Sequence, residues 1–185
     1  ARMCAVSARL IRYRAAFVKR LAAAAGPIHR EFSGGADELE LQYLTVSTVR
    51  DPFSHEREIF YNVCEHQEAH RRAEIESGQC LTGAHKDDIA ISINGRSART
   101  FGSQGQKRTA ALSIKLAERE IFLQETGEYP VLLLDDVLSE LDAKRQDYVL
   151  NRIGAGQTLI TCCEDDGIAK RTGARVLTIS GGRLI

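Results

Sequence analysis

The sequence lacks an apolar run long enough to span a membrane, which excludes a membrane-spanning helix within its 185 residues. Its five cysteines form no C-x-x-C pair, and an odd number of cysteines is a poor basis for a disulfide framework. The formal net charge is zero, so bulk charge does not indicate nucleic-acid binding. Together these absences favour a globular protein of a reducing, cytoplasmic compartment.

Acidic residues are also missing from residues 1–30, where seven basic residues lie. Apolar spacing predicts a helix over 3–25 that Gly26-Pro27 interrupts. The residues expected on its buried face are Val6, Leu10, Phe17 and Leu21. Its basic face either contacts DNA phosphates, which Lys and Arg bind without reading base sequence, or is an ordinary solvated face. A mitochondrial transit peptide has a similar composition, but the apolar positions also suit a docked helix.

The most informative stretch is 101–142. A polar turn, 102–106, opens a helix predicted to extend to residue 124. An aliphatic run, 131–134, then predicts a strand that is buried on both faces of a parallel sheet. Asp135 and Asp136 follow it, at the strand end where ligands bind in such sheets.

These residue types suit a nucleotide phosphate. A helix N-terminus presents unpaired N–H groups and a partial positive charge. Gly105 allows the backbone to approach an anion closely, and the hydroxyl of Ser103 can donate to a phosphate oxygen. Carboxylates bind Mg²⁺, and a second carboxylate can orient or deprotonate a water molecule. The alternative for Asp135-Asp136 is a helix N-cap beside a turn residue.

Three motifs in this stretch resemble those of ABC-type ATPases. Ser103-Gln104-Gly105-Gln106 resembles the signature motif, 131–136 the Walker B strand, and Ser139-Glu140-Leu141-Asp142 the D-loop. The wording FGSQGQ-x-RTAALS-x-KLAE, followed by GEYPVLLLDDVLSELD, is similar to the RecF family of bacterial recombination mediators. Residues 81–89 resemble that family's GPHRDDL segment, and residues 28–35 its I-H-x-x-L-S/T-G-G segment.

The sequence departs from the family pattern at several positions. Lys107 replaces a second Gln, Ala84 a Pro, and Lys86 an Arg. A larger departure is that no G-x-x-x-x-G-K-[ST] loop is present in the sequence. The resemblance places that loop in an N-terminal lobe, so the chain is expected to be the C-terminal portion of a longer protein and to be inactive as an ATPase by itself.

The resemblance implies an α/β fold: the C-terminal part of an ABC-ATPase-type head, with a mixed or parallel sheet flanked by helices, plus a remnant of a helical arm. The expected segments are the end of the arm (1–35), a strand and linker of the head (36–53), the return of the arm (54–80) and the ATPase lobe (81–185).

The resemblance also implies a mechanism with ATP and Mg²⁺. Asp135 is expected to hold the metal, and Asp136 to polarise the attacking water. The signature turn of a second subunit closes over the γ-phosphate, so ATP joins a homodimer. The expected nucleotide-contacting residues are Ser103, Gln104, Gly105, Gln106, Asp142 and Thr161.

The family acts in DNA replication, DNA repair and the SOS response. It binds gapped DNA and double-strand/single-strand junctions, and works with RecR and RecO to load RecA. The candidate DNA-binding residues of this chain are Arg9, Arg12, Lys19, Arg20, Lys107 and Arg108. No membrane is implied as a partner.

Two other functions compete with this one. The first is the head of an SMC- or Rad50-type ATPase, which the SQGQ wording and the Asp-Asp pair disfavour. The second is a non-catalytic module that binds only DNA or a partner protein, against which the presence of Ser103, Asp135 and Asp136 argues.

The remaining segments carry weaker local signals. A strand is predicted at 39–46, a charged helix at 54–77, a hairpin around Asn94-Gly95, a helix from 142 to about 153, a strand at 157–161 and a closing hairpin at 175–185. His66 and His70 are expected at the surface rather than on a metal. Cys162 and Cys163 are expected to be small buried residues. Residues 85–88 either lie near nucleotide or DNA, or pin a loop to the sheet.

Overall fold

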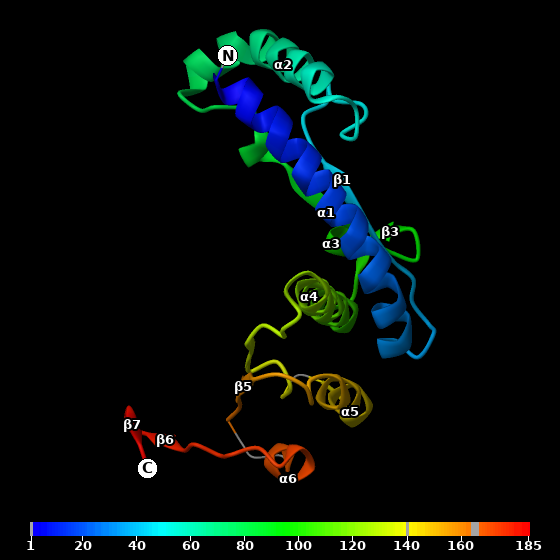
Figure 1. Cartoon of the computed structure of the whole chain (residues 1–185), viewed down its shortest axis with the longest axis vertical. Helices are drawn as coiled ribbons and strands as arrows, with labels where there is room; N and C mark the ends of the chain where they lie inside the picture. The colour runs from blue at the N-terminus through cyan, green and yellow to red at the C-terminus, as the bar shows by residue number, and fades with distance from the viewer. Residues whose placement is uncertain (1, 140, 164–166) are drawn as a thin grey trace. The chain divides into compact units, whose positions relative to one another are not determined.

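The computed structural model describes residues 2–139, 141–163 and 167–185 (Figure 1). It contains helices and both parallel and antiparallel strand pairs, so the predicted α/β class is confirmed. The chain forms two compact units, of which the first extends to Ile121 and the second begins at Phe122. No helix among the described residues is both long enough and apolar enough to cross a membrane.

The first unit combines two long helices with a three-stranded sheet. Its elements are α1 (Arg2–Phe32), β1 (Leu39–Leu44), α2 (Glu56–Ser77), the 3-10 turn η1 (Ala84–Lys86), β2 (Asp88–Ile93), β3 (Arg96–Ser97), α3 (Ala98–Phe101) and most of α4 (Gln104–Thr126). The sheet has the order β1-β2-β3, and both pairs are antiparallel, with Leu41 opposite Ile91. The predicted hairpin at Asn94-Gly95 is confirmed.

Helix α1 is longer than the sequence predicted. It continues through Gly26-Pro27 to Phe32, so the prediction that these residues interrupt it was wrong. The ring of Pro27 lies on the exposed side of α1, whereas Ile28 and Phe32 beyond it are buried. Burial of this last turn offsets the hydrogen bond that proline cannot make.

The predicted buried face of α1 was also wrong in part. Leu21 is buried, but Val6, Leu10 and Phe17 are exposed. The face that packs inward instead contains small and medium side chains, which let neighbouring elements approach closely. These buried residues are Cys4, Ala8, Ile11, Ala15, Val18 and Ala25. One end of this face joins Val46, Val49, Ile59, Val63 and Ala84 in a hydrophobic core.

Helix α4 agrees better with its prediction. Apolar spacing along this helix predicts that Ala110, Ile114, Ala117 and Ile121 or their neighbours are buried. In the structure Ala110, Ala117 and Ile121 are buried, and Ile114 is half-buried. The helix therefore presents a mixed inner face of small and aliphatic residues, and its first turn follows the short helix α3.

The second unit is built on a parallel strand pair. Its elements after α4 are β4 (Leu132–Asp135), α5 (Ala143–Arg152), β5 (Thr158–Thr161), α6 (Ile168–Thr172), β6 (Ile179–Ser180) and β7 (Arg183–Leu184). Strand β4 pairs in parallel with β5, and β6 and β7 form the predicted closing hairpin.

The apolar run of β4 predicted that both faces of the strand are buried, and this prediction was wrong. Leu134 is only 4% exposed, but its neighbour Leu133 is 67% exposed. Leu133 lies opposite Leu159, which is also exposed, so one face of this strand pair is uncovered within the described residues. Cys162 and Cys163, beyond the end of β5, are exposed rather than buried.

Candidate nucleotide site

Ser103 caps the N-terminus of α4 through a reciprocal pair of hydrogen bonds. Its Oγ accepts from the N–H of Gln106 at 3.2 Å, and the side-chain Oε1 of Gln106 accepts from the N–H of Ser103 at 3.1 Å. This arrangement is a capping box, which satisfies two N–H groups that a helix start would otherwise leave unpaired. The predicted polar turn therefore opens a 23-residue helix, as expected.

The approach to this turn requires glycine at position 102. A Cβ there would lie 2.6 Å from the backbone oxygen of Ala98, closer than non-bonded atoms allow. Gly102 thus lets α3 and α4 follow one another with only a tight turn between them. Beyond it, Ser103 and Gln104 are exposed, and Gly105 and Gln106 are half-buried. The exposed start of a long helix is a suitable place for an anion.

The carboxyl end of β4 brings Asp135 and Thr161 together. They are register partners in the parallel pair, and the hydroxyl of Thr161 donates to the carboxylate of Asp135. The Oγ1 of Thr161 also accepts from the backbone N–H of Asp136 at 3.0 Å. One threonine at the end of β5 therefore links both aspartates at the end of β4.

Asp136 adopts a left-handed backbone conformation, with φ of 52°. This region is uncommon for residues other than glycine, although Asp and Asn enter it more readily than most. The Oγ of Ser139 donates to the carboxylate of Asp136 at 2.7 Å, and this contact fixes the side chain within its own turn. Both carboxylates remain exposed, so both are accessible to a ligand.

Asp142, the last residue of the D-loop-like segment, is the N-cap of α5. Its carboxylate accepts from the N–H of Arg145 at 3.0 Å and lies 3.4 Å from the guanidinium of that residue. The structure therefore shows that Asp142 caps helix α5. A role of Asp142 toward a nucleotide stays a prediction. Glu140 of the same segment lies outside the described residues.

The residues at this edge fit a magnesium ion. Mg²⁺ in proteins commonly uses one or two carboxylates, with waters and substrate phosphates completing the octahedron. The exposed carboxylate of Asp135, beside the hydroxyl of Thr161, supplies that chemistry. No group of three or more His, Cys, Asp or Glu among the described residues forms an all-protein metal cage.

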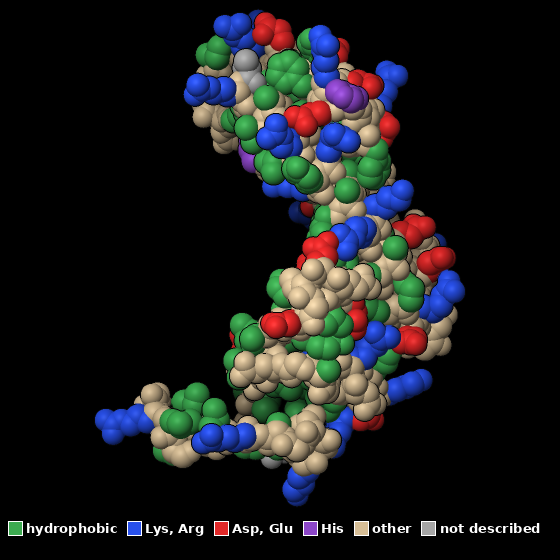
Figure 2. All heavy atoms as spheres, viewed as in Figure 1, with side chains coloured by type: hydrophobic (Ala, Val, Ile, Leu, Met, Phe, Trp, Pro, Cys, Tyr) green, Lys and Arg blue, Asp and Glu red, His purple; other side chains and the backbone are tan. Residues whose placement is uncertain are grey.

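The candidate DNA-binding residues do not form one uniform basic surface. Figure 2 shows basic and acidic side chains interspersed over the part of the molecule that α1 and α2 form. Arg9 lies 3.5 Å from Glu56, and Lys19 lies 5.5 Å from the ring centre of Phe53. Arg12, Arg20 and Arg108 are exposed, and Lys107 is half-buried.

Residues 85–88 pin a loop to the sheet. The side chain of Asp87 is only 2% exposed, and its Oδ2 lies 3.1 Å from the guanidinium of Arg14. Arg14 also donates to the backbone oxygen of Ala84, and the hydroxyl of Tyr43 donates to Asp87. Burial, together with this hydrogen bond to a carboxylate, raises the pKa of Tyr43.

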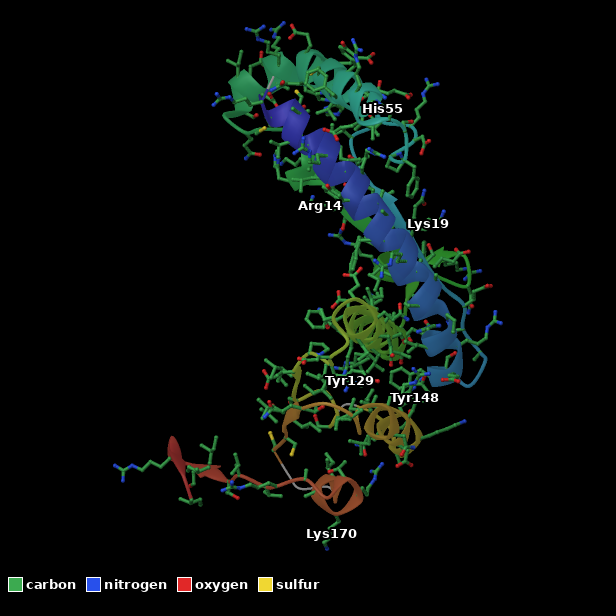
Figure 3. All side chains as sticks on the ribbon, in the orientation of Figure 1. Arg14, Lys19, His55, Tyr129, Tyr148 and Lys170 are labelled. Carbon is green, nitrogen blue, oxygen red and sulfur yellow. The ribbon has the colours of Figure 1, made fainter. Side chains whose placement is uncertain are left out.

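This group joins α1, β1 and η1. Figure 3 shows Arg14 and Lys19 extending from opposite sides of α1. Arg14 lies against Asp87, whereas Lys19 lies over the ring of Phe53. The sequence pattern identified the segment that contains Asp87 but not Arg14 or Tyr43. Arg14 lies 73 positions before Asp87 and Tyr43 lies 44 positions before it, and no local pattern connects either residue to the carboxylate.

His66 was expected at the surface but is buried. Its Nδ1 lies 2.8 Å from the hydroxyl of Thr82, and its ring stacks on that of His70 with centroids 4.0 Å apart. Glu74, one turn further along α2, accepts from the N–H groups of Leu81 and Thr82. Burial first, and then the neighbouring His70, lower the pKa of His66. This face of α2 therefore holds the 81–82 loop.

Comparisons with known proteins agree with these motifs. No protein-family model matches the chain. The chain is 44% identical over 186 residues to the DNA replication and repair protein RecF of Bacillus subtilis (strain 168), a match that covers 97% of the chain and 49% of that relative. It is also 44% identical, over 166 residues, to the DNA replication and repair protein RecF of Listeria welshimeri, covering 88% of the chain and 44% of the relative.

Two solved structures are similar over most of the chain. One is described as the recombination mediator protein RecF-ATPrS in the RecFOR pathway; it has a TM-score of 0.83 and 34% identity, covering 98% of this chain and 47% of that one. The other, described as RecF-ATP in the same pathway, has a TM-score of 0.76 and 35% identity, covering 89% and 44%. The chain thus spans about half the length of the relatives it matches.

Proposed function

Because the chain belongs to the RecF family of DNA replication and repair proteins, we propose that it supplies the signature turn and the Walker B edge of an ATP-dependent recombination mediator. The observation that carries this proposal is the arrangement at the carboxyl end of β4, where Thr161 hydrogen-bonds to Asp135 and to the N–H of Asp136. Solved RecF relatives are described with ATP, which supports a nucleotide as the ligand.

At the β4 edge, Asp135 is the residue that would hold Mg²⁺, which when bound neutralises phosphate charge. Asp136 orients the attacking water and accepts its proton. Its left-handed backbone and its contact with Ser139 fix the direction of this carboxylate, so that little reorganisation is needed when substrate arrives.

The signature turn acts on a nucleotide held by a second copy. The hydroxyl of Ser103 and the first N–H groups of α4 donate to the γ-phosphate and stabilise the charge that develops there. ATP therefore joins two subunits, and hydrolysis releases them. The same dimer binds gapped DNA or a double-strand/single-strand junction in the bacterial cytoplasm. RecR and RecO act with it to load RecA during DNA repair and the SOS response.

The test is a protein in which this chain is joined to the half of the Bacillus subtilis relative that it does not match. Asp136→Asn should lower ATP turnover about 100-fold or more, the effect of losing a general base, and should lengthen the lifetime of ATP-dependent dimers measured by sedimentation or light scattering. Asn tolerates the left-handed conformation at least as well as Asp, so the variant should fold.

Glu128→Gln is the matched control, since Glu128 is an exposed acid of the same unit. It should leave turnover and dimer lifetime unchanged. If nucleotide affects neither the parent protein nor Asp136→Asn, the ATPase proposal is wrong, and a scaffold that binds only DNA or a partner becomes the better explanation.

The 185-residue chain alone gives a second test. Its sequence has no G-x-x-x-x-G-K-[ST] loop to hold the β- and γ-phosphates, so it should not turn over ATP. Measurable ATP hydrolysis by the purified chain, removed by Asp136→Asn, would contradict this expectation.

A further inference from the structure

Gln106 is anchored on both sides of its side-chain amide. Its Nε2 donates to the two carboxylate oxygens of Asp37, at 3.2 and 3.3 Å, while its Oε1 accepts from the N–H of Ser103. Asp37 lies 69 positions earlier in the chain, in the segment between α1 and β1. The signature turn is therefore held by a residue that no motif in the sequence connects to it.

Asp37 is itself fixed by the neighbouring hairpin. The Nδ2 of Asn94 donates to Asp37 at 2.8 Å, and the Oδ1 of Asn94 accepts from the N–H of Glu38 at 2.8 Å. The hydroxyl of Ser33 accepts from the N–H of Asp37 at 3.1 Å. Asn94 and Gln106, from two separate segments of the first unit, thus both donate to one half-buried carboxylate, and Ser33 holds the backbone of the same residue.

The polarity of this arrangement decides which way the amide of Gln106 points. A carboxylate only accepts hydrogen bonds, so it attracts the NH₂ end of the amide and repels its oxygen. With the NH₂ end directed to Asp37, the oxygen is directed to the N–H of Ser103. Asp37 therefore enforces one of the two orientations of the amide, and the capping box of α4 depends on that orientation.

We propose that Asp37 is a positioning residue for the signature turn: it orients the side chain of Gln106 and so holds Ser103 in the conformation that closes over a nucleotide phosphate. This inference rests on the proposed function, in which that turn contacts the γ-phosphate. Because the N–H of Gln106 already donates to Ser103 Oγ, the hydroxyl proton of Ser103 is directed away from the helix and can donate to a phosphate.

A competing effect makes the proposal sharply testable. Asp37 carries a negative charge near a turn that binds an anion, and charge alone would oppose phosphate binding. Asp37→Asn removes the charge but keeps an oxygen that accepts from Gln106, whereas Asp37→Ala removes both. If positioning dominates, Asn preserves function and Ala loses it. If repulsion dominates, both variants strengthen the interaction with nucleotide.

The first readout needs no nucleotide and uses the 185-residue chain. Amide hydrogen exchange at Ser103 should become about tenfold faster in Asp37→Ala, the equivalent of one lost hydrogen bond, and the side-chain NH₂ resonances of Gln106 should shift. Asp37→Asn should stay close to the parent chain. Glu38→Ala is the control, because Glu38 is exposed and its side chain lies 3.7 Å from Arg30 rather than at the turn.

The second readout uses the joined protein described above. The ATP concentration that gives half-maximal dimerisation should rise about tenfold in Asp37→Ala, by the same lost hydrogen bond, and remain near the parent value in Asp37→Asn and Glu38→Ala. Fluorescent-ATP binding to the monomer should be unchanged, because the turn closes on a nucleotide that the other copy holds.

The outcomes are distinguishable. Unchanged exchange at Ser103 in Asp37→Ala overturns the positioning role. Faster exchange without any change in ATP-dependent dimerisation shows a purely structural contact and also overturns it. If the parent joined protein does not dimerise with ATP, the proposed function fails, and with it the role of Asp37 toward nucleotide, whereas the exchange result still reports the state of the turn.

Discussion

The two units of the chain use similar apolar strands but bury them to different extents. In the first unit, Leu39 and Ile93 face each other across β1 and β2, and both are buried. In the second unit, Leu133 and Leu159 face each other across β4 and β5, and both are more than half exposed. An aliphatic run therefore predicts a strand, but the number of layers packed on that strand decides whether both of its faces are buried.

The carboxylates of the two units also differ in how far they are exposed and in what they contact. The first unit places Asp87 and Glu74 where they satisfy backbone and side-chain donors of buried or half-buried loops. The second unit leaves Asp135 and Asp136 exposed at a strand end. We infer that the first unit carries most of the stability that this chain can supply by itself, whereas the exposed aspartates of the second unit are accessible to a ligand.

The largest expected effect compares one aliphatic residue from each unit. Ile59 is fully buried, so Ile59→Ala should cost about 3–4 kcal/mol of the free energy of unfolding, the usual range for a core isoleucine. Leu133→Ala should cost less than about 1 kcal/mol, because its side chain is mostly exposed already.

Urea unfolding followed by circular dichroism measures both effects. The two units can unfold separately, so each transition is fitted by itself. A Leu133→Ala loss as large as that of Ile59→Ala would show that the exposed face of β4 is covered in solution and would remove the contrast between the units.

The next effect concerns the buried carboxylate of the first unit. Asp87→Ala should cost about 2–3 kcal/mol, because Arg14 and Tyr43 lose their common acceptor; the figure is at the low end for a buried pair since Arg14 is partly exposed. Asp88→Ala is the neighbouring control, as Asp88 is exposed, and should cost less than about 0.5 kcal/mol. Equal losses for the two variants would show that the pin formed by Asp87 contributes nothing specific.

A smaller effect is expected at the strand end of the second unit. Thr161→Val removes a hydroxyl that donates to Asp135 and accepts from the N–H of Asp136, and should cost about 1–1.5 kcal/mol. Thr158 lies on the same strand, and its Oγ1 is buried with no partner among the described residues. Thr158→Val should therefore be neutral or stabilising in the same urea experiment. A loss at Thr158 equal to that at Thr161 would contradict the assigned hydrogen bonds.

Much of the local structure could be predicted from the sequence because short-range physics determines it. The capping turn at Ser103, the hairpin at Asn94-Gly95 and the carboxylates after β4 all follow from neighbouring residues. The same is true of helix α5, for which Asp142 is the N-cap.

The errors arose where distant residues decide the outcome. Helix α1 continues past Pro27, and its last turn buries Ile28 and Phe32 and places Nδ1 of His29 3.2 Å from the hydroxyl of Ser113, which is far along the chain on α4. His66 is buried because Thr82 gives its ring a hydrogen-bond partner from a loop after α2. The contacts of Asp37 with Gln106 and of Asp87 with Arg14 could not be predicted for the same reason, since the sequence contains no local signal for either pair.

The smallest expected effect is the pH dependence of the first unit, and it arises from His66. Because burial lowers the pKa of His66 in the folded chain, the unfolded chain binds more protons once the pH falls below the ordinary histidine value of about 6.5. The stability is fully present above that pH and is lost as the pH decreases. Two other titratable groups lie nearby: His70, whose ring stacks on that of His66, and Glu74, whose pKa is lowered by hydrogen bonds from the N–H groups of Leu81 and Thr82.

Glu74 loses its contribution only as the pH falls toward and below the ordinary glutamate value of about 4.3, so a comparison of pH 7.5 with about pH 5.5 separates the effect of His66 from that of Glu74. The urea midpoint of the first unit should decrease over that range in the parent chain and decrease less in His66→Gln. His85→Gln, which changes an exposed histidine, should keep the parental decrease. If the urea midpoint of His66→Gln decreases as much as that of the parent chain, the pH dependence arises from another group. The contact between His66 and Thr82 would then not select the neutral ring.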